Sequence, residues 1–173
     1  PGALVDALGT HMDLQLEPAP ITFNDPATDC NAMRNNVNLS GAYTPSTDTF
    51  AWDDTKITIT ENIMIDGCHL RMDGGVLRVQ STSTNAPVIT IKSGGSLTVT
   101  NDGTKATPGI IRAVSPTYGL NMDIQDGSLI LDNGVLRDVA CDTTTMGCLV
   151  IGNGATLQMM DSGTVYGSAA TSD

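Results

Sequence analysis

The sequence repeats one short motif, Gly75-Val76-Leu77-Arg78-Val79, as Gly109-Ile110-Ile111-Arg112-Ala113-Val114 and again as Gly134-Val135-Leu136-Arg137-Asp138-Val139. The segment Gly163-Thr164-Val165-Tyr166 is a degraded fourth copy. Each copy follows a short segment of alternating apolar residues and a turn. A motif that returns at this spacing predicts a stacked architecture in which each repeat is one structural unit.

From Lys56 onward the chain divides into four rows, aligned on Gly67, Gly95, Gly127 and Gly154 at intervals of 28, 32 and 27 residues. Each row reads strand, corner, strand, corner, strand and loop, and the repeated motif is the third strand. Apolar residues alternate with other residues inside each segment, which is the period of a β-strand. The first strands are expected at 63–65, 89–91, 122–124 and 149–151, and the second strands at 70–72, 97–99, 129–131 and 157–159.

Three short strands in every repeat predict an all-β fold, a parallel β-helix of about four coils with three short strands per coil. Like strands of successive coils would stack about 4.8 Å apart, so their inward residues would form ladders. A β-sandwich also has short strands and glycine turns. It does not need the same three-strand unit in the same order four times, so the β-helix is favoured. The expected ladders are Ile65 with Ile91, Ile124 and Ile151, and Leu70 with Leu97, Leu129 and Leu157.

This pattern, which covers roughly residues 56 to 167, resembles the right-handed, pectin-lyase-like β-helices of cell-surface proteins, adhesins and polysaccharide lyases. The resemblance lies in the repeat pattern and includes no diagnostic motif. It implies a right-handed coil and an extracellular location. It carries no catalytic residue over to this chain.

Residues 1–55 do not follow the repeat and contain four of the six aromatic residues. An open β-helix end exposes backbone groups and apolar core, so this region is expected to be an N-terminal cap or an arm that reaches a neighbouring subunit. Residues 56–173 form the β-helix in this division. The last seven residues, from Gly167 to Asp173, are too small and polar to cap a core, which leaves the last coil open or closed by another copy. The first residue is Pro1 rather than Met, which suggests a removed leader or a trimmed chain, and Thr10-His11-Met12 resembles a cloning remnant.

Composition narrows the range of partners. The chain has 173 residues, enough for one domain, and only 3% of them are aromatic, so the core must consist of Ile, Val, Leu and Met. The chain has eight basic and 19 acidic residues, which gives a net charge of −11. This balance argues against nucleic acid and against anionic membrane surfaces, because both need clustered Lys and Arg. The apolar runs are too short to span a membrane.

The chain has four cysteines and one glycosylation sequon. Cys30, Cys68, Cys141 and Cys148 form no CxxC pair, which argues against zinc. Their even number fits two disulfides in an oxidising compartment, and we expect Cys141 to pair with Cys148 and Cys30 with Cys68. Four reduced thiols are the alternative. Asn38, in Asn38-Leu39-Ser40, is a candidate glycosylation site.

The third strands predict a surface stripe. If they stack, one apolar side chain and one arginine of each motif face outward together. Like charges about 5 Å apart repel, so the arginines need carboxylates nearby, either from the chain itself or from a partner. Apolar and arginine neighbours are typical of protein interfaces. The candidate interface residues are Val76, Arg78, Ile110, Arg112, Val135, Arg137 and Tyr166, and an acidic polysaccharide is the third candidate partner.

Four aspartates close the second strands of the four rows: Asp73, Asp102, Asp132 and Asp161. Stacked carboxylates with turn carbonyls are candidate calcium ligands, and ordinary turn chemistry is the alternative. No other cofactor is expected. Two isolated histidines, His11 and His69, are too few for a catalytic triad, so no catalytic residue is assigned and the chain is expected not to be an enzyme.

These observations favour a structural subunit of an extracellular assembly such as a sheath, surface layer or filament. Its copies would polymerise through β-helix ends and side stripes, so the main expected partner is the chain itself. A carbohydrate-binding or adhesin module, with cell-surface polysaccharide as partner, is the alternative, and a polysaccharide lyase is the third possibility.

Overall fold

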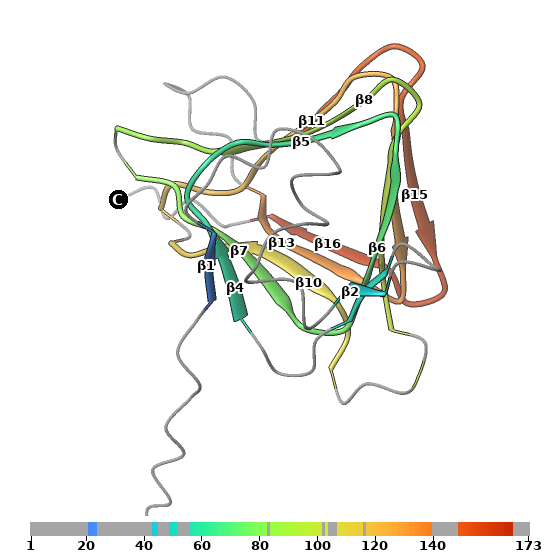
Figure 1. The fold of residues 1–173 in the computed structure, drawn as a ribbon, viewed down its shortest axis with the longest axis horizontal. Helices are drawn as coiled ribbons and strands as arrows, with labels where there is room; N and C mark the ends of the chain where they lie inside the picture. The colour runs from blue at the N-terminus through green and yellow to red at the C-terminus, as the bar shows by residue number, and fades with distance from the viewer. Residues whose placement is uncertain are drawn as a thin grey trace, which may run out of the picture.

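The computed structural model describes residues 21–23, 43–44, 49–51, 56–82, 84–101, 103, 107–115, 117–139 and 149–167. Every helix or strand assigned in this part of the chain is a β-strand, and the strands form three sheets that make the three sides of a triangular solenoid (Figure 1). The all-β prediction is therefore confirmed. The described residues contain no helix long and apolar enough to cross a membrane.

The order of the strands in each sheet follows the order of the repeats. The first sheet contains β5 (Ile63–Asp66), β8 (Val88–Lys92), β11 (Asn121–Ile124) and β14 (Leu149–Ile151). The second contains β2 (Tyr43–Thr44), β3 (Thr49–Ala51), β6 (His69–Asp73), β9 (Ser96–Thr100), β12 (Ser128–Asp132) and β15 (Thr156–Met160). The third contains β1 (Ile21–Phe23), β4 (Lys56–Ile59), β7 (Val76–Val79), β10 (Ile110–Ala113), β13 (Val135–Val139) and β16 (Thr164–Gly167).

The chain passes through the three sheets in turn, so β5, β6 and β7 form the first complete row and β14, β15 and β16 the fourth. From the first row to the fourth, the stacked strands make about three turns of solenoid. Neighbouring strands pair in parallel, as in β5 with β8 and β6 with β9, and the exception is β2 with β3. Seen in Figure 1, the chain winds clockwise as it recedes from the viewer, which is the right-handed sense expected of parallel crossovers.

The core consists of the predicted ladders. Ile65 pairs in register with Ile91, Ile91 with Ile124, and Ile124 with Ile151, and the ladder that begins at Leu70 is equally regular. Burial alternates along the strands, as the period-2 pattern requires, because successive side chains point to opposite faces of a sheet. The ladders therefore fill the triangular interior with aliphatic side chains and methionine.

The sheets begin before residue 56. Strand β1 pairs in parallel with β4, and β3 pairs in parallel with β6, so strands from the first 55 residues continue the third and second sheets. These strands lie outside the repeat, so the sequence gives no sign of which row each one joins. The expected role of residues 1–55 as a cap or arm stays a prediction, since most of this region lies outside the described residues.

The glycine that precedes the third strand is needed for close packing in the last three rows. A Cβ atom on Gly134 would overlap the carbonyl oxygen of Val99 and lie 2.6 Å from its carbonyl carbon. A Cβ atom on Gly163 would meet the carbonyl group of Leu131 in the same way. Left-handed backbone is found instead at Gly75, which opens the first copy of the motif, and at other corner glycines such as Gly94, each with φ of 71°. In the last three rows the motif therefore opens on glycine because the corner brings this residue against the backbone of the preceding row.

Cys68 takes part in a disulfide. The other three cysteines, Cys30, Cys141 and Cys148, lie outside the described residues. Which of them pairs with Cys68 therefore stays a prediction. Asn38 also lies outside them.

Candidate functional site

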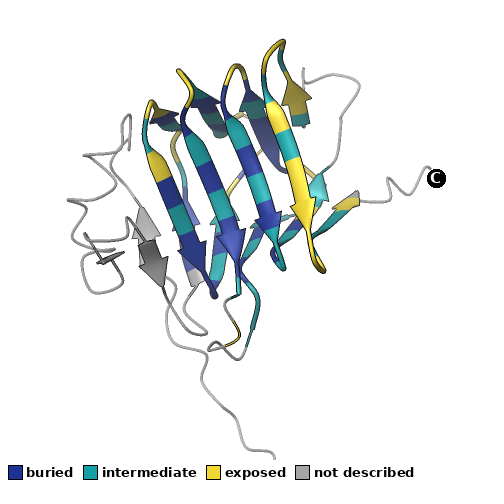
Figure 2. Cartoon of the chain, turned by 90° about the vertical axis from the view of Figure 1, so that its right-hand side faces the viewer, coloured by how far each residue is buried: buried dark blue, intermediate teal, exposed yellow. Residues whose placement is uncertain are grey.

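The C-terminal end of the solenoid exposes the residues that would otherwise be core. In the first three rows the inward residues are buried, but in the fourth row Ile151 is 47% exposed and Met159 is 57% exposed. Leu149, Leu157 and Val165 are only half-buried. Figure 2 shows this contrast in the second sheet, where β15 is mostly exposed and its neighbour β12 is not.

The other end of the same ladders is covered. Ile63 is 2% exposed and Ile65 is 1% exposed, although β5 is the last strand of the first sheet on that side. Leu70 and Met72, at the corresponding positions of β6, are buried as well. The two ends therefore differ, and the large exposed core residues belong to the C-terminal end.

The exposed end also presents backbone. Within the described part of the chain, β14, β15 and β16 are the final strands of their sheets, so each has one edge with no neighbouring strand. Natural sheets commonly protect such edges with lysine, proline, inward charges or bulges. Residues 149–167 contain no Lys, Arg, His or Pro and a single charged residue, Asp161. This end thus lacks the usual side-chain devices against strand pairing.

The predicted arginine stripe lies on the outer face of the third sheet, and the register supports its first two rows. Val76 pairs with Ile110 and Arg78 with Arg112. Val135 continues the apolar column beside Ile110. These five residues are half-buried. Among the described residues the Arg78 side chain makes no hydrogen bond or ion pair.

The third arginine departs from the stripe at a β-bulge. The pairing of β10 with β13 ends at Leu136, the register with β16 shifts before Val139, and Asp138 has a positive φ of 60°. The shift turns the Asp138 carboxylate toward Arg112, whose Nε lies 3.4 Å from Oδ2. That oxygen is buried and accepts no hydrogen bond in the described structure, so the ion pair is its main compensation.

Arg137 instead lies over an aromatic ring. Its guanidinium carbon is 5.2 Å from the centre of the Tyr166 ring, within the range of a cation–π contact. Both side chains are exposed. The seven predicted interface residues therefore form two groups, a half-buried stripe on β7, β10 and β13, and an exposed Arg137–Tyr166 pair next to the open end.

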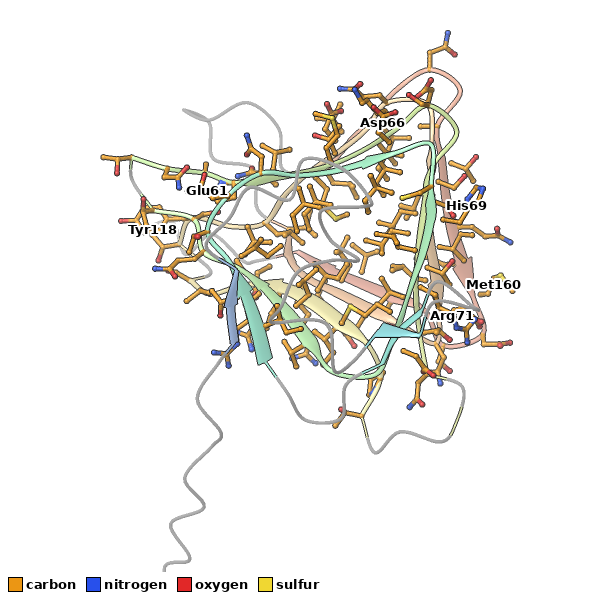
Figure 3. The ribbon with its side chains drawn as sticks, in the orientation of Figure 1. Glu61, Asp66, His69, Arg71, Tyr118 and Met160 are labelled. Atoms are coloured by element: carbon orange, nitrogen blue, oxygen red, sulfur yellow. The ribbon has the colours of Figure 1, made fainter. Side chains whose placement is uncertain are left out.

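The outer face of the second sheet is mostly polar, with Ile130 and Met160 as exceptions. His69, Ser96, Ser128 and Thr156 share one column, and His69 Nδ1 lies 2.8 Å from Ser96 Oγ. Figure 3 shows His69, Arg71 and Met160 projecting from this side of the solenoid, away from the core. The column could contact a hydroxyl-rich ligand, although the face has no aromatic side chain among the described residues.

The four predicted calcium ligands do not share one column. Asp73 is in register with Thr100, Thr100 with Asp132, and Asp132 with Met160. Asp161 follows in the corner, with φ of 50°, and Asp102 lies outside the described residues. Within the described part of the chain no three His, Cys, Asp or Glu side chains cluster as metal ligands do. Calcium binding stays a prediction.

One corner carries a polar network between rows. Lys92 Nζ lies 3.1 Å from Asp66 Oδ2, and the Ser93 N–H donates to the Asp126 carboxylate. A hydrogen bond from Ser93, and then one from Lys92, lower the pKa of the Asp66 carboxyl below its ordinary 3.8, while desolvation opposes them. These contacts join the corners of neighbouring rows at the surface, where ion pairs contribute little to stability.

Comparison with protein families, curated proteins and solved structures finds no match to this chain. Function must therefore be inferred from the surfaces of the molecule itself. Of these, the open C-terminal end was expected from the small, polar residues that follow Gly167. The displacement of Arg137 was not, because one extra residue in a strand leaves the apolar pattern before it unchanged.

Proposed function

We propose that this chain is a structural subunit of an extracellular assembly, such as a sheath, surface layer or filament, whose copies join through the exposed end of the solenoid. The observation that carries this proposal is the half-exposed fourth row of the core ladders, with Ile151 and Met159 as its most exposed inward residues. An apolar patch of this kind in a protein is characteristic of a contact surface.

Association at this end has two favourable contributions. Burying a Leu, Ile or Met side chain completely is worth about 1.5–3 kcal/mol relative to leaving it exposed, and several such side chains lie together here. A strand added to each open edge would also complete the backbone hydrogen bonds of β14, β15 and β16. An assembled solenoid would thus continue the same core and sheets that hold each copy together.

The stripe on the third sheet is a candidate for the second contact that an extended assembly needs. Arg78 makes no ion pair within the described residues and sits beside the half-buried Val76 and Ile110. In a chain with a net charge of −11, an unpaired arginine next to apolar surface favours the acidic side of another copy. Lateral contacts through this stripe would link stacked units into a sheet or filament.

An extracellular location is part of the proposal. The disulfide at Cys68 fits an oxidising compartment. The triangular solenoid with three strands per turn is also compatible with the pectin-lyase-like β-helices that the sequence pattern resembles. That resemblance concerns architecture and supports no catalytic assignment, so we propose a structural role and no enzymatic one.

The polar column of the second sheet favours one alternative, a carbohydrate-binding module. Ser96, Ser128 and Thr156 could donate and accept hydrogen bonds with sugar hydroxyl groups. Binding of the chain to a glycan array, lost in Ser128→Lys, would support this alternative over self-assembly. A polysaccharide lyase, the third candidate, would reveal itself by unsaturated products formed from uronate polymers.

The proposal is tested by Met159→Lys, with sedimentation and electron microscopy of the purified chain as the measurements. Wild type should associate as its concentration rises, whereas the variant should stay monomeric because the new ammonium group would be desolvated in the contact. Val114→Lys is the matched control, since Val114 is 43% exposed but lies in the loop after β10. A wild-type chain that stays monomeric at high concentration would refute the proposal.

A further inference from the structure

A second copy of the chain could meet the exposed end with either of its own two ends. The opposite end of a second copy presents Ile63 and Ile65, which are already buried. The same end of a second copy presents the same half-exposed ladder residues and open strand edges.

We infer that two copies meet end to end through their fourth rows, related by a two-fold axis perpendicular to the solenoid axis. This inference rests on the proposed self-assembly and specifies its geometry. A two-fold contact is self-complementary, since each residue on one subunit meets a counterpart on the other. The resulting unit is a dimer, which the stripe on the third sheet could then link to further dimers.

Charge favours this arrangement over most other contacts between copies. Each chain has a net charge of −11, so two copies repel each other over most orientations. Residues 149–167 carry only the charge of Asp161, in the corner after β15. Apposed fourth rows therefore bring together the surfaces with the least repulsion, and depletion of charge is the usual composition of an interface core.

The two-fold axis fixes which strands meet. Viewed along the solenoid, both copies are triangles, and rotation about an axis through the middle of one side returns that side to itself and exchanges the other two. The direction of winding is reversed in the second copy, so all three new strand pairs are antiparallel. With the axis through the second sheet, β15 meets β15 of the partner subunit, and β14 meets the partner's β16.

The second sheet is the best side for this axis. Strand β15 pairs with β12 over all five of its residues without a shift, so its free edge is the longest and most regular of the three. Strand β14 has three residues, and the pairing of β16 with β13 is interrupted at the bulge. Strand β15 also carries Met159, the most exposed of the large hydrophobic side chains in the described residues.

Side-chain orientation then fixes the register. Leu157 and Met159 belong to the inward ladders, and the residues between them face outward. Inward residues can oppose inward residues only if the axis passes through a residue, because an axis between two residues would oppose inward to outward side chains. An axis at Gln158 uses all five residues, with Leu157 opposite Met159 of the partner subunit and the two Gln158 amides facing each other.

A cysteine on the axis tests this geometry directly. Residues opposite each other in an antiparallel pair have Cα atoms about 4.5–5.5 Å apart, which is within the range of a disulfide. Mild oxidation of Gln158→Cys should therefore link two copies through the new cysteine, identified by mass spectrometry so that native cysteines are distinguished. Gln80→Cys is the matched control, because Gln80 is also exposed and follows β7 in the first row.

We expect about a tenfold excess of linked dimer for Gln158→Cys over Gln80→Cys, since an axial pair has an effective concentration near the millimolar range. Preferential linkage of Val150→Cys or Tyr166→Cys would place the axis on β14 or β16 and overturn the register. Association in sedimentation without linkage at Gln158 would refute the two-fold geometry while leaving self-assembly intact. A monomer in both measurements would refute the proposed function together with the inference.

Discussion

At the scale of single residues, the backbones of neighbouring rows come so close at one corner that only glycine fits. The corner that opens the third strand places Gly109, Gly134 and Gly163 against carbonyl groups at the end of a second strand. None of the three has a positive φ. Their role is therefore steric, and it differs from that of Gly94, whose backbone is left-handed and whose surroundings are open.

This difference predicts two sizes of effect for the same substitution. Gly134→Ala should lower the free energy of unfolding by about 3 kcal/mol, because the new methyl group overlaps the Val99 backbone and that backbone belongs to the stack. Gly94→Ala should cost about 1 kcal/mol, the penalty of a left-handed alanine. Urea unfolding followed by circular dichroism would measure both. Equal costs would contradict the steric explanation.

The bulge at Asp138 is the second residue-scale feature. Because of the bulge, Arg137 does not continue the ladder of Arg78 and Arg112. Arg112 instead pairs with Asp138, and Arg137 contacts the ring of Tyr166. A third arginine in register would have added like-charge repulsion along the stripe. The bulge avoids that repulsion and directs a cation toward the last row.

At the scale of elements, strands with the same sequence pattern differ in how much their side chains contribute to the free energy of unfolding. Leu129 in β12 is fully buried between two rows, whereas Leu157 in β15 packs against one row and is half-buried. The same leucine ladder thus has one member in the interior of the solenoid and another at its open end.

Leu129→Ala should therefore lower the free energy of unfolding by about 3 kcal/mol, since it removes a buried side chain and leaves a cavity between rows. Leu157→Ala should cost about 1 kcal/mol in the dilute monomer, because less apolar surface returns to water and no closed cavity forms. Thermal unfolding at low concentration measures both costs. A loss for Leu157→Ala as large as that for Leu129→Ala would mean that the fourth row is covered in the monomer.

The strands of the four rows were predictable because one rule governs them all. Ile65, Ile91, Ile124 and Ile151 recur at the same place in each row, and parallel stacking makes that recurrence a contact. Strands β1 and β3 follow no such repeat, and they pair with rows that the sequence does not link to them. The ion pair of Arg112 depends on the bulge at Asp138, which shifts the register without altering the apolar residues that define the motif.

At the scale of the whole molecule, a solenoid is held together by contacts between adjacent rows. Its stability is approximately a sum over rows and their interfaces, so a row with one neighbour is the least stable. The fourth row has one neighbour within the described structure, and its core residues are half-exposed. The core residues of the first row, at the other end of the ladders, are buried. Unfolding should consequently begin at the C-terminal end.

Association through that end should make the stability of the whole molecule depend on concentration, because a partner that binds only the folded state shifts the unfolding equilibrium by mass action. We expect the Tm of the wild type to rise as the protein is concentrated. Hydrogen exchange of the amides in β14, β15 and β16 should slow over the same range, while exchange in β8 and β9 stays unchanged.

Met159→Lys separates association from a general effect of concentration. Its Tm and its exchange rates in the fourth row should stay constant, at the values of the dilute wild type, because the variant cannot bury the new charge against a second copy. Val114→Lys should follow the wild type. If the Met159→Lys chain still gains stability on concentration, the copies meet elsewhere on the solenoid, and the stripe of Arg78 and Arg112 becomes the surface to test.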